Sequence, residues 1–192
     1  MKYTHQESTK NTKLPANEFE LAKIHIETVM KGKQVKRLLF VNPPDVDENI
    51  FDYEIEKRGR GNNYPSYGIG ILAAQLRKLD YDVSIINLNH EVLKEVYLNN
   101  DANNFDFIKT WQKKIKDRIN DFKPDIVGVS CLFSVTHNSF KKVCAFIKKE
   151  FKDLPILIGG VHVSHDIEGV IKDLKGIDLV CLFEADLALP NL

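Results

Sequence analysis

Five short apolar runs, each rich in β-branched residues or leucine, recur along the chain with helical patterns between them. They read "RLLFV" (37–41), "DVSIINL" (82–88), "DIVGVSC" (125–131), "PILI" (155–158) and "DLVCL" (178–182). Near-continuous apolar runs of this length are typical of parallel strands that are covered on both faces. Strand alternating with helix predicts an α/β fold, a doubly wound five-stranded parallel sheet with right-handed crossovers. We expect the flavodoxin-like strand order 2-1-3-4-5, with a ligand site beyond the carboxyl ends of the strands.

Four amphipathic stripes predict the helices of this domain. The stripes are Ile69, Leu72, Ala73 and Leu76; Ile108, Trp111, Ile115, Ile119 and Phe122; Phe140, Val143, Cys144, Ile147 and Phe151; and Ile167, Val170, Ile171 and Leu174. Gly176 is expected to cap the last of them. Before the first strand, "NEFELAKIHIETVMKGK" predicts a further helix capped by Asn17, and the polar residues 1–15 are expected to be disordered. The chain thus divides into an N-terminal extension (1–36) and one domain (37–192).

Composition argues against several classes of function. The chain has 27 basic and 27 acidic residues, and the basic residues are scattered, so nothing favours nucleic acid or a membrane surface as a partner. No apolar run approaches the length of a membrane span, and the N-terminus lacks the apolar core of a signal peptide. The three cysteines (Cys131, Cys144 and Cys181) lie far apart in the sequence, which favours a reducing compartment. We therefore expect a cytoplasmic protein.

The stretch "YPSYGIGILAAQL" contains Gly68-x-Gly70-x-x-Ala73, the spacing of a dinucleotide-binding turn. That turn must follow the first strand directly, whereas these glycines come well after it. It also needs an acidic residue at the end of the second strand, where this chain has Asn87 and Asn89. The pattern therefore argues against a nicotinamide or flavin site. The glycines instead let a helix begin close to a neighbouring surface, either of the protein or of a large ligand.

Candidate site residues follow three of the predicted strands. After the first come Asn42, Pro43 and Pro44, which open a long aperiodic segment; such a segment is either functional or a solvated loop. After the third strand, Ser130, Leu132 and Thr136 lead into a helix, and the hydroxyls would serve either a ligand or ordinary helix capping. The fourth strand runs into Gly159, Gly160, Val161 and His162, where paired glycines permit either close approach of a bulky group or a tight turn.

Taken together, "RLLFVNPP", "YPSYGIGILAAQLRKLDYDVSIINLN", "PDIVGVSCLFSVT", "PILIGGVHVS" and "GIDLVCLFEAD" resemble the cobalamin-binding N-terminal domain of cobalamin-dependent radical-SAM enzymes. The resemblance covers roughly residues 37–192. It implies that cobalamin binds base-off, with its dimethylbenzimidazole detached from cobalt and inserted into an apolar slot. The broader family has a cobalt-ligating histidine after the first strand, but this chain has none between Val41 and Tyr67. That absence is typical of the radical-SAM branch.

The resemblance also implies roles for individual residues. Ser130 would meet the free ring nitrogen, Leu132 and Val161 would form apolar walls, and Gly159 and Gly160 would let the nucleotide tail pass. His162 would contact the cofactor or shape its loop. The full set of implied cofactor-binding residues is Asn42, Pro43, Pro44, Tyr67, Gly68, Ser130, Leu132, Thr136, Gly159, Gly160, Val161, His162 and Glu184. On this basis Gly160→Trp is expected to fill the slot and leave the fold intact.

Three departures qualify the functional expectation. The family motif Gly-Glu-Gly-Glu here reads Phe183-Glu184-Ala185-Asp186, and the chain stops at "ADLALPNL", as if truncated before a catalytic core. The three cysteines also cannot form the Cys-x-x-x-Cys-x-x-Cys motif of an iron–sulfur cluster.

The chain is therefore expected to be a cobalamin-binding module without catalytic residues or a protein-bound metal of its own. It would serve a methyltransferase-like radical-SAM domain or chain that carries the S-adenosylmethionine and the cluster. The alternative is a degenerate scaffold that has lost the cofactor. A signalling receiver domain is disfavoured, because Asn42, Ser130 and Leu182 stand where its acidic residues and lysine belong.

Overall fold

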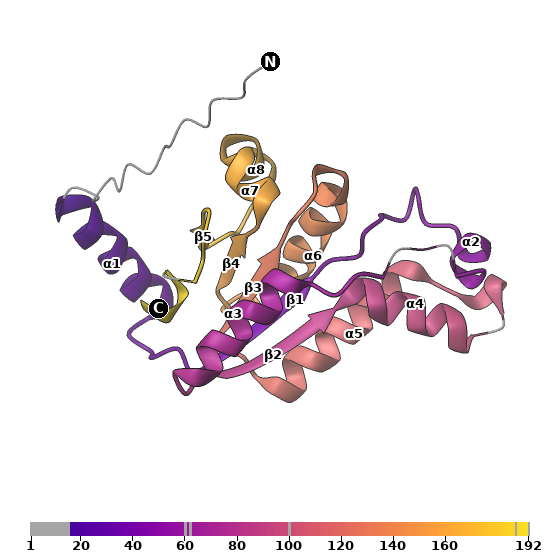
Figure 1. Cartoon of the computed structure of the whole chain (residues 1–192), viewed down its shortest axis with the longest axis horizontal. Coiled ribbons are helices and arrows are strands. Elements are labelled where there is room, and N and C mark those ends of the chain that lie inside the picture. The colour runs from indigo at the N-terminus through magenta and orange to yellow at the C-terminus, as the bar shows by residue number, and fades with distance from the viewer. Residues whose placement is uncertain (1–15, 60, 62, 100, 187, 192) are drawn as a thin grey trace, which may run out of the picture. The chain divides into compact units, whose positions relative to one another are not determined.

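The computed structural model describes residues 16–59, 61, 63–99, 101–186 and 188–191 (Figure 1). The described residues divide into two units, one before and one after the boundary between residues 33 and 34. In the first unit, α1 spans Ala16–Met30. The predicted helix is therefore present, but Asn17 lies inside its first turn and does not cap it. The expectation of disorder for residues 1–15 lies outside the described residues.

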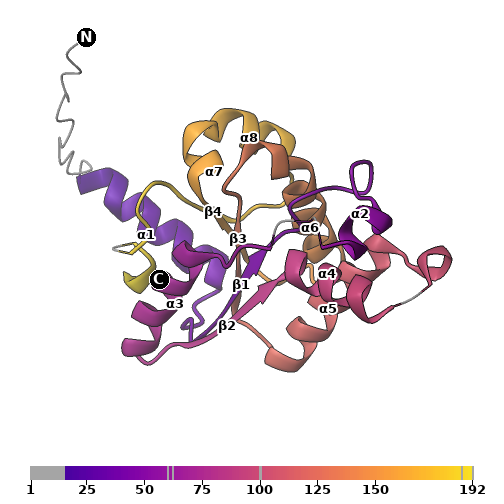
Figure 2. The same ribbon diagram turned by 45° about the vertical axis from the view of Figure 1, so that its right-hand side comes forward.

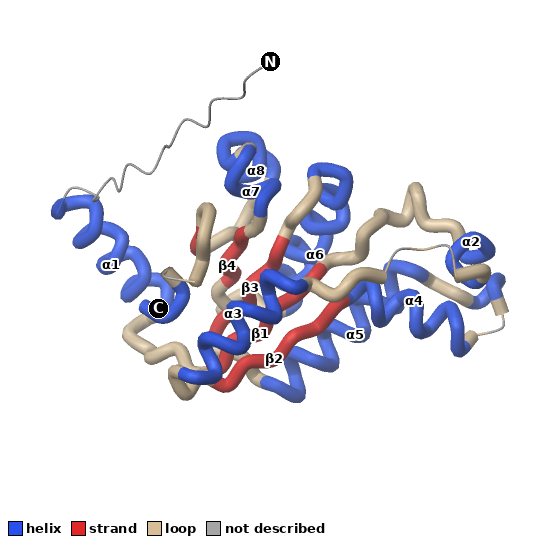
Figure 3. Tube along the Cα trace, in the orientation of Figure 1, coloured by secondary structure: helices blue, strands red, loops and turns tan. Residues whose placement is uncertain are grey.

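The second unit is built on the predicted five-stranded parallel sheet (Figure 3). Its strands are β1 (Arg37–Asn42), β2 (Asp82–Asn87), β3 (Ile126–Ser130), β4 (Ile156–Gly159) and β5 (Leu179–Cys181). All four pairings are parallel, and the strand order is β2-β1-β3-β4-β5. The fold class and strand order expected from the sequence are confirmed.

Helices cover both faces of this sheet. They are α2 (Tyr53–Lys57), α3 (Tyr67–Lys78), α4 (Leu88–Leu98), α5 (Phe107–Phe122), α6 (His137–Glu150), α7 (Val161–His165) and α8 (Ile167–Asp173), with short 3-10 turns η1 (Ala102–Asn104), η2 (Ser134–Thr136) and η3 (Leu189–Asn191). Figure 2 shows α3 on one side of the strands and α4, α5 and α6 on the other. None of the described helices is both long and apolar enough to cross a membrane.

The main core lies on the face covered by α4, α5, α6 and α8. Alternate strand residues such as Val41, Val129 and Ile158 point into it, where they pack with Trp111 of α5 and Phe140 of α6. All of these side chains are buried because strand residues alternate between faces and each helix buries one stripe. The intervening strand residues face α3, on the opposite side of the sheet.

Sequence patterns missed the helices α2, α4 and α7. Residue Leu88 was assigned to a strand, but the side chain of Asn87 accepts a hydrogen bond from His90 N at 3.1 Å and starts α4. The last predicted helix also ends earlier than expected. Leu174 is the C-cap of α8, and Gly176 lies in the following turn with φ +79°.

The segment between β1 and α3 is packed at several points, contrary to the solvated-loop alternative. The buried amide of Asn89 exchanges two 3.1 Å hydrogen bonds with Asp45. Lys57 Nζ donates to the carbonyl oxygens of Val96, Tyr97 and Asn99 at the end of α4, at 2.9, 2.9 and 2.6 Å. Because these are the orphan carbonyls of a helix terminus, the lysine caps α4 from a distant part of the chain.

Candidate functional site

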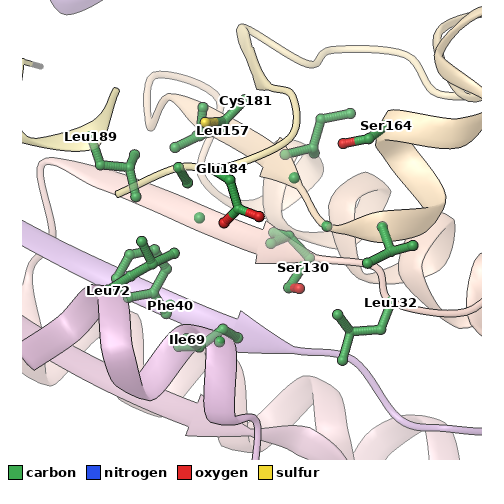
Figure 4. Close-up of a pocket in the computed structure, with 18 of the residues that line it drawn as sticks. Phe40, Ile69, Leu72, Ser130, Leu132, Leu157, Ser164, Cys181, Glu184 and Leu189 are labelled. Carbon is green, nitrogen blue, oxygen red and sulfur yellow. The ribbon is translucent and has the colours of Figure 1, made fainter. Parts of the chain in front are cut away.

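A cavity of about 490 Å³ lies on the α3 face of the sheet (Figure 4). Its floor comes from β1, β3 and β4 and one wall from α3. The remaining lining comes from the loop after β3, the turn after β4, and β5 with the segment that follows it. This volume is in the range of pockets that hold drug-sized ligands. The lining is mostly hydrocarbon with a few polar groups, which suits a flat aromatic group attached to a polar arm.

Two rows of paired strand residues form the floor. In the first row, Phe40 pairs with Gly128, and Gly128 pairs with Leu157. In the second, Ser130 pairs with Gly159. A side chain on Gly128 would come within 2.8 Å of the Phe40 ring, so the glycine makes room for that ring. The floor is therefore shaped by residues that alternate with the core-facing ones along the same strands.

The α3 wall presents Gly68, Ile69 and Leu72 to the cavity. A Cβ atom added at Gly68 would meet no heavy atom within 4 Å, and the same holds for Gly70. Neither glycine is therefore required by close contact with the described part of the chain. Of the two, Gly68 lines the cavity and Gly70 does not. Gly68 therefore leaves this part of the cavity wall without side-chain bulk.

Polar groups reach the cavity from three strand ends. In Figure 4 the Ser130 hydroxyl and the Glu184 carboxylate both point into the space between the floor and α3. The Ser164 hydroxyl also borders it and accepts a hydrogen bond from Phe183 N at 2.8 Å. That bond ties the segment after β5 to α7. The arrangement can offer a hydroxyl and a carboxylate to a ligand whose body is apolar.

The backbone conformation of Gly160 and its contacts within the protein leave room only for glycine at this position. It has φ +112° and ψ 169°, a conformation that is essentially restricted to glycine. A side chain there would also overlap the carbonyl oxygen of Cys131. The expectation that Gly160→Trp would leave the fold intact is therefore wrong. At Gly159 the constraint is milder, with Cys181 O 3.2 Å from the place of a Cβ atom.

The cavity brings together about half of the residues predicted from the sequence. Those that line it are Gly68, Ser130, Leu132, Gly159, Gly160, Val161 and Glu184. Those that do not are Asn42, Pro43, Pro44, Tyr67, Thr136 and His162. Each group comes from several elements that are distant in sequence, so only the fold decides the division.

The residues away from the cavity have identifiable neighbours. Asn42 Nδ2 donates to Asn87 Oδ1 at 3.3 Å, and Pro43 and Pro44 are buried behind it. Tyr67, at the start of α3, is 77% exposed and does not line the cavity. Thr136 precedes α6, but its hydroxyl donates back to Phe133 O at 2.8 Å and does not cap the helix.

Sequence reasoning missed several lining residues, among them Phe40, Gly128, Leu157, Ser164 and Cys181. All except Ser164 lie on strands that the pattern treats as buried on both faces. The signal that could have found them is the period of two: Gly128 and Ser130 share a face, as do Leu157 and Gly159. Given Ser130 and Gly159 as site residues, the same-face neighbours follow.

A pair of histidines, His137 and His162, lies near the cavity, after the carboxyl ends of β3 and β4. His162 is 9% exposed and forms hydrogen bonds with His137 and with Ser134. Burial and the nearby His137 lower the pKa of His162, so its neutral form is favoured. Among the described residues, no group of three or more histidine, cysteine or acidic side chains is arranged to hold a metal ion.

Comparison with known protein families agrees with this geometry. Residues 58–192 match the model of the B12 binding domain. The match begins after β1 and includes every cavity-lining residue except Phe40. A search of curated proteins found no match to the chain. Since the family model covers well over half of the sequence, the chain belongs to the B12-binding domain family.

Proposed function

We propose that this protein binds cobalamin base-off, with the nucleotide tail in the cavity between α3 and the sheet. Membership of the B12-binding domain family supports cobalamin as the ligand. The observation that carries the placement is the wall at Gly68, which opens onto an apolar cavity of about 490 Å³ without any protein neighbour for a side chain. The corrin ring would lie outside, over the carboxyl ends of the strands.

The residues that line the cavity are chemically suited to the nucleotide tail of cobalamin. The aromatic base would lie among Phe40, Leu72 and Leu157, where burial of apolar surface contributes about 25 cal/mol per Å². The Ser130 hydroxyl would donate to the free ring nitrogen, and the Glu184 carboxylate would accept from hydroxyl groups of the arm. When bound, cobalamin would supply a cobalt centre for methyl transfer.

The resemblance noted in the sequence supports a radical-SAM catalytic domain or chain as the partner that uses this cofactor. S-adenosylmethionine and an iron–sulfur cluster would belong to that partner, because Cys131, Cys144 and Cys181 do not have the required spacing. All three are free, and two are fully buried. A reducing, cytoplasmic setting is part of the proposal.

The test is retention of hydroxocobalamin. The purified protein is mixed with the ligand and desalted, and its visible spectrum is recorded. We expect a retained base-off spectrum for the natural sequence. Gly68→Phe should abolish retention by filling the cavity. Gly70→Phe, two residues later on the same helix and outside the cavity lining, should retain the ligand. A colourless natural protein would favour the alternative, a non-binding scaffold.

The other outcomes are equally informative. Retention by Gly68→Phe at the level of the natural sequence would remove the tail from this cavity while leaving cobalamin binding in place. A retained base-on spectrum would contradict the detached base. The scaffold alternative rests on the exposed apolar side chains of Phe133, Val135 and Phe183 at the carboxyl edge of the sheet, which would serve as a protein contact.

A further inference from the structure

A chain of four side chains outside the cavity lining joins the turns that follow β3 and β4. Ser134 Oγ lies 3.1 Å from His162 Nδ1, and His162 Nε2 lies 3.0 Å from His137 Nδ1. His137 Nε2 lies 2.9 Å from Asp173 Oδ2. Ser134 and His137 follow β3, two and five residues after the cavity-lining Leu132. His162 follows β4 and comes directly after the cavity-lining Val161.

The direction of each hydrogen bond follows from one fixed acceptor. The ionised Asp173 can only accept, so His137 must donate from Nε2. A neutral His137 then accepts at Nδ1, which makes His162 the donor from Nε2. His162 in turn accepts at Nδ1 from the Ser134 hydroxyl. Every donor in the chain thus meets an acceptor, and the tautomer of both rings is determined by the network.

This side-chain link repeats a backbone link between the same two segments. Cys131 N donates to Gly159 O at 2.9 Å, and His162 N donates to Cys131 O at 3.2 Å. The backbone bonds hold the ends of β3 and β4 together at the base of the turns. The histidine pair holds the turns themselves, farther along, where Leu132 and Val161 border the cavity.

We propose that His137 and His162 are positioning residues that clamp the β3 and β4 walls of the cavity in the spacing that accepts the cobalamin tail. This inference rests on the proposed function. Neither ring lines the cavity, so the clamp acts through the turns that carry Leu132 and Val161. Its effect is on how tightly the cofactor is held and on the mobility of the turn after β4.

Protonation provides a way to open the clamp. One added proton is tolerated, because the bond between the rings then still has one donor and one acceptor. Two added protons are not, because Nδ1–H of His137 and Nε2–H of His162 would face each other at 3.0 Å. Several other charges act on the pair. Asp166 favours the charged form of His162, while Asp173 contacts both His137 and Lys141.

Two substitutions of His137 separate the effect of its hydrogen bond to His162 from the effect of its protonation. His137→Asn keeps an acceptor near the place of Nδ1 but cannot take up a proton. His137→Phe keeps the ring and removes every hydrogen bond. His90→Phe, on an exposed histidine of α4 outside the cavity and the clamp, is the matched control. For each protein the hydroxocobalamin affinity is measured by spectral titration between pH about 8 and about 4, because the lowered pKa of His162 places the second protonation of the pair below the usual histidine range.

At neutral pH we expect His137→Phe to bind up to about tenfold more weakly than the natural sequence, the effect of losing one or two net hydrogen bonds. The natural protein should lose affinity toward the acid end, and His137→Asn should keep near-natural affinity with a flatter pH profile. Hydrogen exchange of residues 159–166 in the cobalamin-free protein should accelerate in His137→Phe alone.

Natural affinity together with natural exchange in His137→Phe would overturn the clamp. If the natural sequence binds no cobalamin, the proposed function fails, and the exchange comparison still decides whether the histidines hold the turn. Should His137→Phe unfold, the comparison of His137→Asn with the natural protein is the deciding one. An equally steep acid loss of affinity in His137→Asn would then overturn the role of the histidine pair.

Discussion

The carbonyl oxygen of Cys131 fills the space where a side chain on Gly160 would begin. This contact joins the loop after β3 to the turn after β4 and lies directly beneath one border of the cavity. It shows that backbone packing can require the second glycine of the pair at this strand end, independently of any ligand. Within α3, Gly68 has the opposite surroundings, with open space toward the cavity.

Replacing Gly160 should therefore destabilise the protein itself. We expect Gly160→Ala to lower the free energy of unfolding by about 1–3 kcal/mol, because the residue has φ +112° and its new methyl group would strike Cys131 O. Gly70→Ala should instead raise it by about 0.5–1 kcal/mol, since alanine favours a helix and meets open space there. Urea denaturation measures both. Equal effects of the two substitutions would contradict this account.

Lys57 should matter for the stability of the segment between β1 and α3. Lys57→Met keeps most of the apolar stem but removes three hydrogen bonds to the carboxyl end of α4. We expect a loss of about 1–2 kcal/mol in the free energy of unfolding. The control is Lys94→Met, at an exposed position on α4 itself, where the change should be near zero. A negligible effect of Lys57→Met would show that other contacts suffice to hold α2.

Cysteine reactivity offers a probe of the cavity. Cys131 and Cys144 are at most 1% exposed, whereas Cys181 is half-buried and lines the cavity. Burial raises the pKa of the Cys181 thiol, so its alkylation should be slow and should accelerate at alkaline pH. We expect iodoacetamide to modify Cys181 first, as read by mass spectrometry, and bound cobalamin to slow this severalfold. Modification of Cys181 at the same rate with and without retained cobalamin would contradict the proposed placement.

The acid stability of the protein should depend in part on Asp106. Hydrogen bonds from the Lys109 backbone and side chain hold the pKa of this N-cap carboxyl below its usual range. A lowered folded-state pKa stabilises the protein above the unfolded pKa, and that contribution is lost as the pH falls through the folded value. Asp106→Asn, which still caps the helix, should therefore be slightly less stable at neutral pH and lose less stability between pH about 5 and about 2. The free energy of unfolding of both proteins is measured as a function of pH. If the two values fall in parallel as the pH is lowered, Asp106 makes no such contribution.

Most elements with a strong hydrophobic period were predicted correctly from the sequence, and elements without one were missed. The five strands and the stripes on α3, α5, α6 and α8 were predictable, because burial imposes a period of two or of 3.6 on the residues themselves. Helix α4 was missed because Asn87 ends β2 and caps the helix without any intervening turn. The segment containing α2 has no period, since long-range contacts such as Lys57 with the end of α4 hold it in place.

The candidate site was predictable only in outline. Strand ends of a parallel sheet meet at one edge, so Ser130, Gly159 and Glu184 could be expected together from their order in the chain. Which neighbours share the cavity depends on the register of β1, β3 and β4, and no single residue encodes that register. The position of His162 is an example: it directly follows the lining residue Val161, yet its ring does not line the cavity and is hydrogen-bonded to His137.

Periodic burial in the amino-acid sequence predicts the α/β class, because strands and helices bury residues with different periods. The strand order was expected by analogy with flavodoxin-like sheets and is confirmed by the parallel pairings, and the strand ends after β3 and β4 were predicted as places for a ligand. The packed fold was needed to show that Cys131 O leaves room only for glycine at position 160, that Gly68 borders the cavity without a protein neighbour, and that two histidines link the turns after β3 and β4. Those distinctions depend on distances between residues far apart in the chain, and such distances exist only once the strands are paired and the helices packed.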